Sequence, residues 1–129
     1  MAKGALVIIS APSGTGKSTI CRKLLQGRKD LRYSVSYTTR EPRPGEKNGK
    51  HYFFLDQEEF KRHIQRNGFL EWAVVHDQYY GTPRRFIESS IKEGYHVLLA
   101  IDTQGAAAIR RKIPDSIMIF LVPPSMESL

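Results

Sequence analysis

The chain has 129 residues, enough for one domain with a hydrophobic core and too few for two independent domains. Hydrophobic residues make up 40% of it, and no apolar stretch approaches the roughly 20 residues of a membrane-spanning helix. The formal net charge of +7 indicates an anionic partner. Because the basic residues form no dense run and no zinc-finger or aromatic RNA-binding pattern accompanies them, we expect small phosphorylated ligands and not nucleic acid.

The cysteine, the histidines and the N-terminal residues argue against a disulfide-bonded protein, a histidine metal site and a secreted protein. Cys21 is the only cysteine, cannot form an internal disulfide, and is predicted to be a buried apolar residue. The four histidines are scattered without ligand-like spacing, so we expect no histidine metal site. Residues 1–4 lead straight into an apolar run without the pattern of a secretory signal peptide, and we expect a cytoplasmic location.

The first motif along the chain is A-P-S-G-T-G-K-S, between an apolar run at Leu6 to Ser10 and a helical pattern over Lys17 to Leu25. A strand, a glycine-rich turn and a helix N-terminus in this order form a phosphate-binding loop. In such a loop Lys17 contacts the β- and γ-phosphates of a nucleoside triphosphate, and Ser18 ligates Mg²⁺. The residues assigned to triphosphate binding are Ala11, Pro12, Ser13, Gly14, Thr15, Gly16, Lys17 and Ser18.

Two points qualify this motif. The first position is usually glycine, and Ala11 replaces it at the entry of the turn, away from the phosphate cradle. The alternative interpretation is an ordinary turn between a strand and a helix that happens to be rich in small residues. That alternative requires the glycines, Lys17, Ser18, the strand and the helix to coincide by chance.

After the first helix the pattern changes to that of a small α+β insertion. A helix is expected from about Asp56 to Arg66, because Asp56 and Glu59 form a capping box and Asn67-Gly68 supplies a stop. A second helix is expected over about Pro83 to Lys92, ending at Gly94. The strand-like pieces are Tyr33 to Thr39, His51 to Leu55 and Phe69 to His76, with turn signals at residues 42–45 and 48–49.

Around this insertion the sequence predicts an α/β core. Three apolar runs have the β-branched content of buried parallel strands, namely Leu6 to Ser10, His96 to Ile101 and Ile117 to Val122. Helical patterns follow the first two runs, at Lys17 to Leu25 and at Gly105 to Lys112. Alternation of strands and helices implies a layered α/β core with right-handed crossovers.

Two arginines lie three residues apart in the insertion, Arg40 and Arg43, around a turn stiffened by proline. Each guanidinium is a planar fork of donors that matches phosphate oxygens, and two of them suit a phosphate monoester. Tyr52 and Tyr80 are candidates to add phenolic donors. Taken alone, such a pair is also consistent with a solvated charged loop, but its coupling to a phosphate-binding loop favours an acceptor phosphate site.

Two carboxylates complete the set of candidates. Glu71 lies within the apolar run F-L-E-W, and a carboxylate can accept the N1–H and N2–H₂ donors of guanine together. An edge-strand glutamate facing solvent is the alternative. Asp102 follows the second core strand, where open α/β sheets bind their ligands, so we expect it in the same crevice as the phosphate loop.

These motifs together resemble the guanylate kinase family, particularly its bacterial form. The matching segments are S-A-P-S-G-T-G-K-S-T, S-V-S-Y-T-T-R-E-P-R-P-G-E, N-G-K-H-Y-F-F, F-L-E-W-A, Y-Y-G-T and I-D-T-Q-G, in family order from Leu6 to the end. The resemblance implies a kinase that transfers the γ-phosphoryl group of ATP to GMP with Mg²⁺. It implies that Lys17, Arg40 and Arg43 act in catalysis and that the GMP site comprises Ser36, Arg40, Arg43, Tyr52, Glu71, Tyr80, Thr82 and Asp102.

The resemblance also implies a fold and a division of the chain. The fold is that of the P-loop nucleoside monophosphate kinases, here one domain over residues 1–129. Its parallel-sheet core would comprise residues 1–33 and 95–129, and its GMP-binding insertion about 34–94. The expected partners are ATP and GMP, with no nucleic acid and no membrane, and the oligomeric state stays open.

Two departures from the family pattern bear on function. Ala100 stands where the family usually has an acidic residue, which puts any role of that carboxylate near Mg²⁺ or GMP in doubt. The sequence stops at Leu129, where family members continue into an arginine-rich lid and the last core elements. We therefore hypothesise a shortened form of a longer enzyme with impaired activity, since loss of lid arginines would cost on the order of 10³-fold in turnover.

Two other functions fit parts of the pattern. A guanylate-kinase-like scaffold module would bind phosphopeptides without catalysis, but the phosphate loop of such modules is typically degraded, whereas Gly14, Gly16, Lys17 and Ser18 are all present here. Another nucleoside monophosphate kinase would differ only in the base pocket. Glu71 favours guanine over adenine, because adenine presents an acceptor at N1 where guanine presents a donor.

Overall fold

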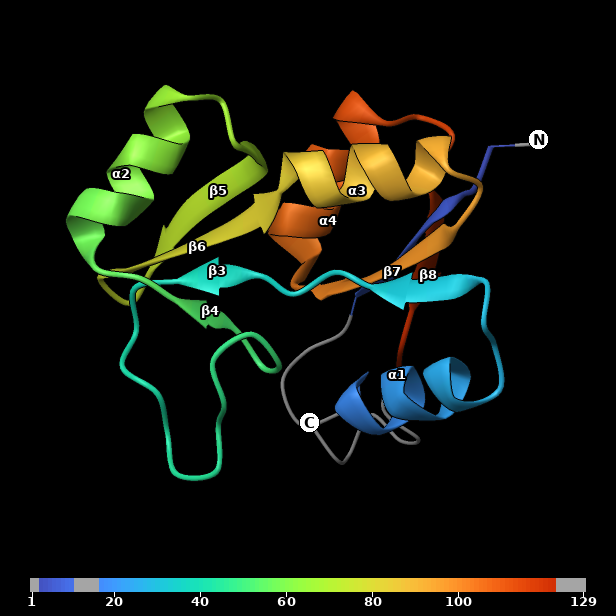
Figure 1. Ribbon diagram of the computed structural model, residues 1–129, viewed down its shortest axis with the longest axis horizontal. Coiled ribbons are helices and arrows are strands. Elements are labelled where there is room, and N and C mark those ends of the chain that lie inside the picture. Colours follow the sequence, from blue (N-terminus) through green and yellow to red (C-terminus); the bar gives the residue numbers. More distant parts are fainter. Residues whose placement is uncertain (1–2, 11–16, 123–129) are drawn as a thin grey trace. The chain divides into compact units, whose positions relative to one another are not determined.

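The computed structural model describes residues 3–10 and 17–122 and divides into two compact units (Figure 1). The first unit combines Met1–Tyr33 with Ser90–Leu129, and the second is Ser34–Ser89. The insertion expected at about residues 34–94 extends further along the chain than this second unit. Among the helices of the described ranges, none is long and apolar enough to cross a membrane.

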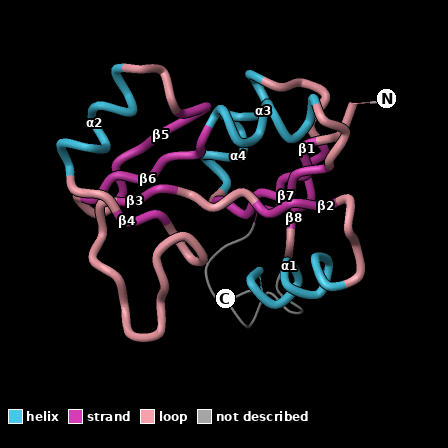
Figure 2. The backbone as a smooth tube through the Cα atoms, viewed as in Figure 1, coloured by secondary structure: helices cyan, strands magenta, loops and turns pink. Residues whose placement is uncertain are grey.

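The first unit is built on a four-stranded parallel sheet in the order β2-β7-β1-β8. Figure 2 shows the strands in magenta. Its strands are β1 (Leu6–Ser10), β2 (Leu31–Tyr33), β7 (His96–Ile101) and β8 (Ile117–Phe120). Helix α1 (Lys17–Gln26) lies on one face of this sheet and α4 (Thr103–Lys112) on the other (Figure 1). Because both faces are covered, the central strands β1 and β7 are continuous apolar runs, as predicted.

One apolar cluster joins the sheet to α1. Ile9 from β1 and Leu98 from β7 are almost fully buried against Cys21 of the helix. The side chain of Leu25, one helical turn further on, packs against the same cluster. The prediction that Cys21 is a buried apolar residue is thereby confirmed.

Two predictions about the strands of this unit are wrong. The strand-like piece expected over Tyr33 to Thr39 is divided, because β2 ends at Tyr33 and pairs with β7 while the next strand belongs to the other sheet. The run expected to be buried from Ile117 to Val122 is strand only as far as Phe120 and is partly exposed. Strand β8 pairs with β1 alone in the described sheet, so Ile117 and Phe120 remain 50% and 59% exposed.

The second unit has its own four-stranded sheet in the order β4-β3-β6-β5. Strands β3 and β4 are parallel to each other, and the pairs β3–β6 and β5–β6 are antiparallel. Helix α3 begins in this unit and ends in the first. The elements are β3 (Tyr37–Thr38), β4 (Phe53–Phe54), α2 (Gln57–Gln65), β5 (Phe69–Val75), β6 (Gln78–Pro83) and α3 (Arg84–Lys92).

Helix α2 begins and ends where its capping residues predict. The Asp56 carboxylate accepts a hydrogen bond from the Glu59 backbone N–H at 2.8 Å, which satisfies one of the free donors of the first turn. At the other end Asn67 adopts a left-handed φ of 56°, and the Gly68 N–H donates to the His63 carbonyl at 2.8 Å. The predicted N-cap and the predicted stop are both confirmed.

Aromatic rings hold this helix on its sheet. Phe60 of α2 is fully buried and stacks on Phe69 of β5, with ring centroids 4.6 Å apart. Tyr79 of β6 lies 5.2 Å from Phe60. Gly81 is necessary for this packing, because a Cβ there would lie 2.8 Å from the Phe69 ring.

The sequence analysis missed strand β6, which forms a hairpin with β5. The register runs from Val75↔Gln78 at the turn to Glu71↔Thr82 further along. The two turn residues, His76 and Asp77, have φ values of 50° and 64°. Two consecutive positive φ values are typical of a type I′ hairpin turn, whose usual sequence signal is a glycine that this turn lacks.

Candidate functional site

The glycine-rich segment of the predicted phosphate loop lies outside the described residues. This applies to Ala11, Pro12, Ser13, Gly14, Thr15 and Gly16, and to the side chains of Lys17 and Ser18. Its two flanks are described, since β1 ends at Ser10 and α1 begins at Lys17. The strand and the helix on either side of this segment are therefore the predicted ones, and the phosphate contacts of the segment stay predictions.

Asp102 follows the strand that neighbours this loop. Ile101, the last residue of β7, pairs with Ser10, the last residue of β1 before the loop. The exposed Asp102 carboxylate accepts a hydrogen bond from the Gly105 N–H at 2.7 Å and caps helix α4. The cap explains why α4 begins at Thr103, two residues before the predicted start at Gly105. Ala100, at the position where the family pattern has an acidic residue, lies on β7.

The other seven residues predicted to bind GMP all belong to the second unit. Among them, the Arg40 side chain is held firmly in place, because it is only 13% exposed and forms a bidentate ion pair with Glu46. Its Nη1 and Nη2 donate to Glu46 Oε1 and Oε2 at 2.9 and 3.0 Å. The Arg40 backbone N–H donates to the buried hydroxyl of Thr38 at 3.2 Å, which fixes the chain where β3 ends.

Tyr52 and Tyr80 lie beside Arg40, as the sequence analysis expected. The Tyr52 ring centroid is 5.1 Å from the Arg40 guanidinium carbon and 6.1 Å from the Tyr80 ring. Tyr80 pairs across the sheet with Thr38, two residues before Arg40. The pKa of Arg40 lies above its usual value, chiefly through the hydrogen bond to Glu46 and to a smaller extent through Tyr80. The cluster presents a cation and phenolic groups within one small region.

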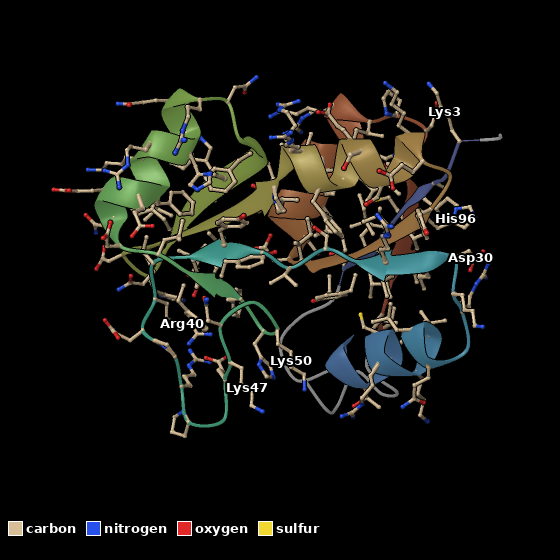
Figure 3. All side chains as sticks on the ribbon, viewed as in Figure 1. Lys3, Asp30, Arg40, Lys47, Lys50 and His96 are labelled. Carbon is tan, nitrogen blue, oxygen red and sulfur yellow. The ribbon has the colours of Figure 1, made fainter. Side chains whose placement is uncertain are left out.

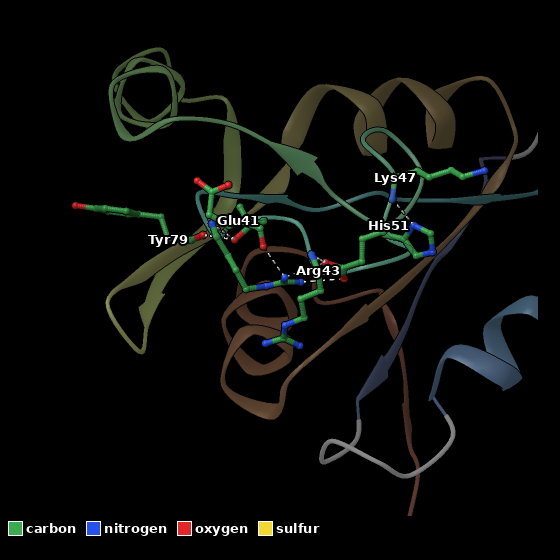
Figure 4. Close-up of polar contacts among 8 residues, drawn as sticks. Glu41, Arg43, Lys47, His51 and Tyr79 are labelled. Atoms are coloured by element: carbon green, nitrogen blue, oxygen red, sulfur yellow. Dashed lines mark hydrogen bonds and ion pairs between the residues drawn. The ribbon is translucent and has the colours of Figure 1, made fainter.

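Arg43 is exposed, and the structure joins it to Arg40 through a carboxylate. The Arg43 backbone N–H donates to Glu46 Oε1 at 2.8 Å, on the same oxygen that accepts from Arg40. Figure 3 shows Arg40, Lys47 and Lys50 along the loop between β3 and β4. Further along the loop the Lys47 N–H donates to His51 Nδ1 at 3.0 Å (Figure 4). Several basic side chains therefore line a loop that local hydrogen bonds hold in shape.

Glu71 and Thr82 form the other half of the candidate site. They face each other across the β5–β6 pair, and the Thr82 hydroxyl donates to Glu71 Oε1 at 3.4 Å. Thr82 and Tyr80 are two residues apart on β6, so they share a face with Cα atoms about 7 Å apart. The Ser36 carbonyl accepts from the Phe53 N–H at 2.9 Å, which places Ser36 beside the residue that follows Tyr52.

Glu46 is the residue that the sequence analysis missed. Its position at the end of the motif around the two arginines predicts no role of its own. The available signal was an acidic residue close to two basic ones in a turn with prolines, which does not by itself predict a contact. A hollow of about 240 Å³ also borders Arg40, lined by Thr39, Arg40, Glu41, Pro42, Phe54, Leu55 and Asp56, and it shares only Arg40 with the predicted GMP residues.

The Arg40–Glu46 pair predicts an acid-sensitive contribution to stability. The hydrogen bonds from Arg40 and from the Arg43 backbone lower the pKa of Glu46 from 4.5 to about 2. A lowered folded-state pKa stabilises the fold above pH 4.5, and this contribution is lost as the pH falls towards 2. We expect about 1 to 2 kcal/mol of unfolding free energy to be lost between pH 6 and pH 3, allowing for solvent screening.

Urea unfolding of the wild type and of Glu46→Gln at pH 6, 4.5 and 3 measures this contribution. The variant lacks the titrating group, so its unfolding free energy should fall less steeply with pH. Parallel pH curves for the two proteins would contradict the assignment.

A parallel α/β core with a glycine-rich loop after its first strand, together with a separate α+β unit, is the fold of the P-loop nucleoside monophosphate kinases. The crystal structure of guanylate kinase from Anaplasma phagocytophilum is similar to this chain, with a TM-score of 0.86 and 40% sequence identity. The match covers 98% of this chain and 64% of that one.

Sequence comparison identifies one family within this class of kinases. The family model for guanylate kinase matches residues 3–129. Guanylate kinase from Caldanaerobacter subterraneus is 54% identical over 127 residues, and that from Shewanella violacea is 51% identical over 129 residues. These matches cover 98% and 99% of this chain and 62% of each relative. The chain belongs to the guanylate kinase family, and it spans about 62% of the length of these curated relatives.

Proposed function

We propose that this chain carries the ATP- and GMP-binding parts of a guanylate kinase, which converts ATP and GMP to ADP and GDP. The observation that carries the proposal is the arrangement on the second unit. This unit holds a nearly buried arginine with two tyrosines beside it, and a carboxylate and a hydroxyl that are paired across two strands of its sheet. The first group suits a phosphate monoester, and the second suits the donor edge of guanine.

Arg40, Arg43, Tyr52 and Tyr80 are proposed to hold the acceptor phosphate. Glu71 would accept the N1–H and N2–H₂ of guanine, and Thr82 and Ser36 would supply hydroxyl groups around the base. Adenine presents an acceptor at N1, which would face the Glu71 carboxylate with no proton between them, whereas guanine presents a donor there, so the arrangement favours guanine. Asp102 is proposed to act at the acceptor side of the phosphate loop, and Ala100 contributes no carboxylate there.

The proposed reaction is an in-line phosphoryl transfer. An oxygen of the GMP phosphate forms a bond to the γ-phosphorus of ATP while the bond from that phosphorus to the β–γ bridging oxygen breaks, and the electron pair stays with ADP. Lys17 orients the β- and γ-phosphates and offsets their charge. Arg40 and Arg43 hold the acceptor in line, so the residues contribute positioning and electrostatic stabilisation without a covalent intermediate.

Ser18 is the residue proposed to ligate Mg²⁺. A hydroxyl oxygen is the hard type of ligand that Mg²⁺ prefers, and the family resemblance assigns Ser18 to it. When held there, Mg²⁺ would supply positive charge that offsets negative charge on the transferred phosphoryl group. A cytoplasmic location is part of the proposal, since charged nucleotides do not cross a lipid bilayer unaided.

Separate calorimetric titrations with GMP, AMP and ATP·Mg²⁺ test the proposed function. We expect binding of GMP and ATP, and binding of AMP at least 10-fold weaker than that of GMP. Binding of GMP without ATP would favour the scaffold alternative. Equal affinity for AMP and GMP would contradict the role of Glu71.

A further inference from the structure

We propose that Glu46 is a positioning residue for the acceptor phosphate, holding the Arg40 guanidinium so that its remaining donors face the ligand. The inference rests on the proposed function, because it deepens the description of the same GMP site. Glu46 itself is not assigned to contact the nucleotide. Its carboxylate acts through Arg40 and through the backbone at Arg43.

The contacts of Glu46 tie three parts of one loop together. Its two oxygens accept from Arg40 Nη1 and Nη2, and Oε1 also accepts from the Arg43 N–H. The Glu46 N–H in turn donates to the Arg43 carbonyl at 2.9 Å. Gly45 has a φ of 85°, which this turn requires just before Glu46. The carboxylate is thus held by the backbone as well as by the arginine, and its side chain is 19% exposed.

These contacts leave a defined edge of the guanidinium. Of its five N–H groups, two donate to Glu46, and a second N–H of Nη1 donates to the Glu41 carbonyl at 3.0 Å. The two remaining N–H groups are those of Nε and of Nη2 on the side that faces Nε, and Tyr80 is the neighbouring side chain that can hydrogen-bond to the guanidinium there. They lie on one edge of the planar group and form a fork that matches two oxygens of a phosphate.

Two tyrosines lie close to the same guanidinium. The Tyr52 ring lies 5.1 Å from the guanidinium carbon. Tyr80 is the only group besides Glu46 that raises the pKa of Arg40 among the described residues. A phosphate on the remaining edge would therefore meet Arg40 in a region that also holds the two phenols proposed for the site.

A carboxylate beside an anion site has two opposing effects on binding. Its negative charge repels the phosphate, so its removal should strengthen binding if charge alone mattered. Its bidentate contact fixes a long side chain that otherwise loses rotamer freedom when the ligand binds. The two effects change GMP affinity in opposite directions, so the sign of the change distinguishes positioning from simple repulsion.

The test is the calorimetric affinity for GMP of the wild type, Glu46→Gln and Glu46→Asp. Positioning predicts about 10-fold weaker binding for Glu46→Gln, a loss typical of a group that supports a binding residue. Glu46→Asp keeps the carboxylate and should recover part of that loss. Glu58→Gln on α2 is the matched control, because it makes the same change of charge at an exposed site. We expect its affinity to stay within 2-fold of the wild type.

A competition titration with guanosine separates positioning from a general loss of structure. Guanosine lacks the phosphate, so its affinity should be unchanged in Glu46→Gln if only the phosphate half of the site is affected. Equal losses for GMP and guanosine would overturn the inference, as would GMP binding that is unchanged or tighter. If Glu46→Gln does not fold, GMP affinity of Glu46→Asp equal to the wild type overturns it and weaker binding supports it. Failure of the wild type to bind GMP would instead refute the proposed function.

Discussion

Arg40→Ala is expected to weaken GMP binding by about 100-fold. The substitution removes the two charge-assisted hydrogen bonds that Arg40 is proposed to donate to the phosphate, and a bond to a charged group contributes about 1.5–3 kcal/mol. It also leaves the Glu46 carboxylate without its bidentate partner, next to the incoming anion. A 100-fold loss corresponds to about 2.7 kcal/mol, which these two effects readily supply.

Calorimetry with GMP and with ATP·Mg²⁺ measures this effect and its selectivity. ATP affinity should change little, since Arg40 is assigned to the acceptor site. Arg40→Lys should give an intermediate GMP affinity, because lysine keeps the charge but has no planar fork. Arg62→Ala, an exposed site in the last turn of α2, is the control with the same loss of charge. A loss in Arg40→Ala no larger than in this control would refute the assignment.

Lys17→Ala is expected to lower turnover by about 100-fold or more while changing the GMP KM little. Lys17 stands at the junction of the phosphate loop and α1, where it would offset charge on the β- and γ-phosphates as the β–γ bond breaks. Loss of one preorganised group that stabilises transition-state charge typically costs 10²–10³-fold in kcat. Because other residues are proposed to bind GMP, the KM for GMP should change little.

Steady-state kinetics with both nucleotides varied, on wild type and variant chains of the same length, checks this prediction. Lys23→Ala is the matched control, since this exposed residue lies in the last turn of the same helix. Undiminished kcat in Lys17→Ala would eliminate the catalytic role. A variant that instead lost GMP affinity would indicate that Lys17 acts at the acceptor site.

Much of the secondary structure was predictable because it depends on local patterns. Strands β1 and β7 lie in the centre of a sheet covered on both faces, so their sequences are unbroken apolar runs. Helix α2 has the N-cap residue Asp56 at its start and Asn67-Gly68 at its end, and both act as expected. The end of α3 is likewise marked by Gly94, with a φ of 95°.

The errors fall on elements whose state depends on distant partners. Strand β2 has only three residues with Arg32 in the middle, so nothing local indicates a core strand, and pairing with β7 makes it one. Strand β6 follows a turn at His76 and Asp77 that lacks glycine, so no local turn signal predicts the hairpin. The apolar composition of β8 suggested burial, but its edge position leaves it partly exposed.

The candidate site divides in the same way. The sequence indicated the kinds of ligand through the phosphate-loop motif, Arg40, Arg43 and Glu71. Groups that recognise phosphate or guanine are properties of the side chains themselves, so they can be identified before the fold is known. Which partner each side chain contacts depends on the folded backbone. Cross-strand register brings Glu71 to Thr82, and a closed turn brings Glu46 to Arg40. Sequence spacing specifies neither contact, since both arise from hydrogen bonds made only after the sheet and the loop have formed.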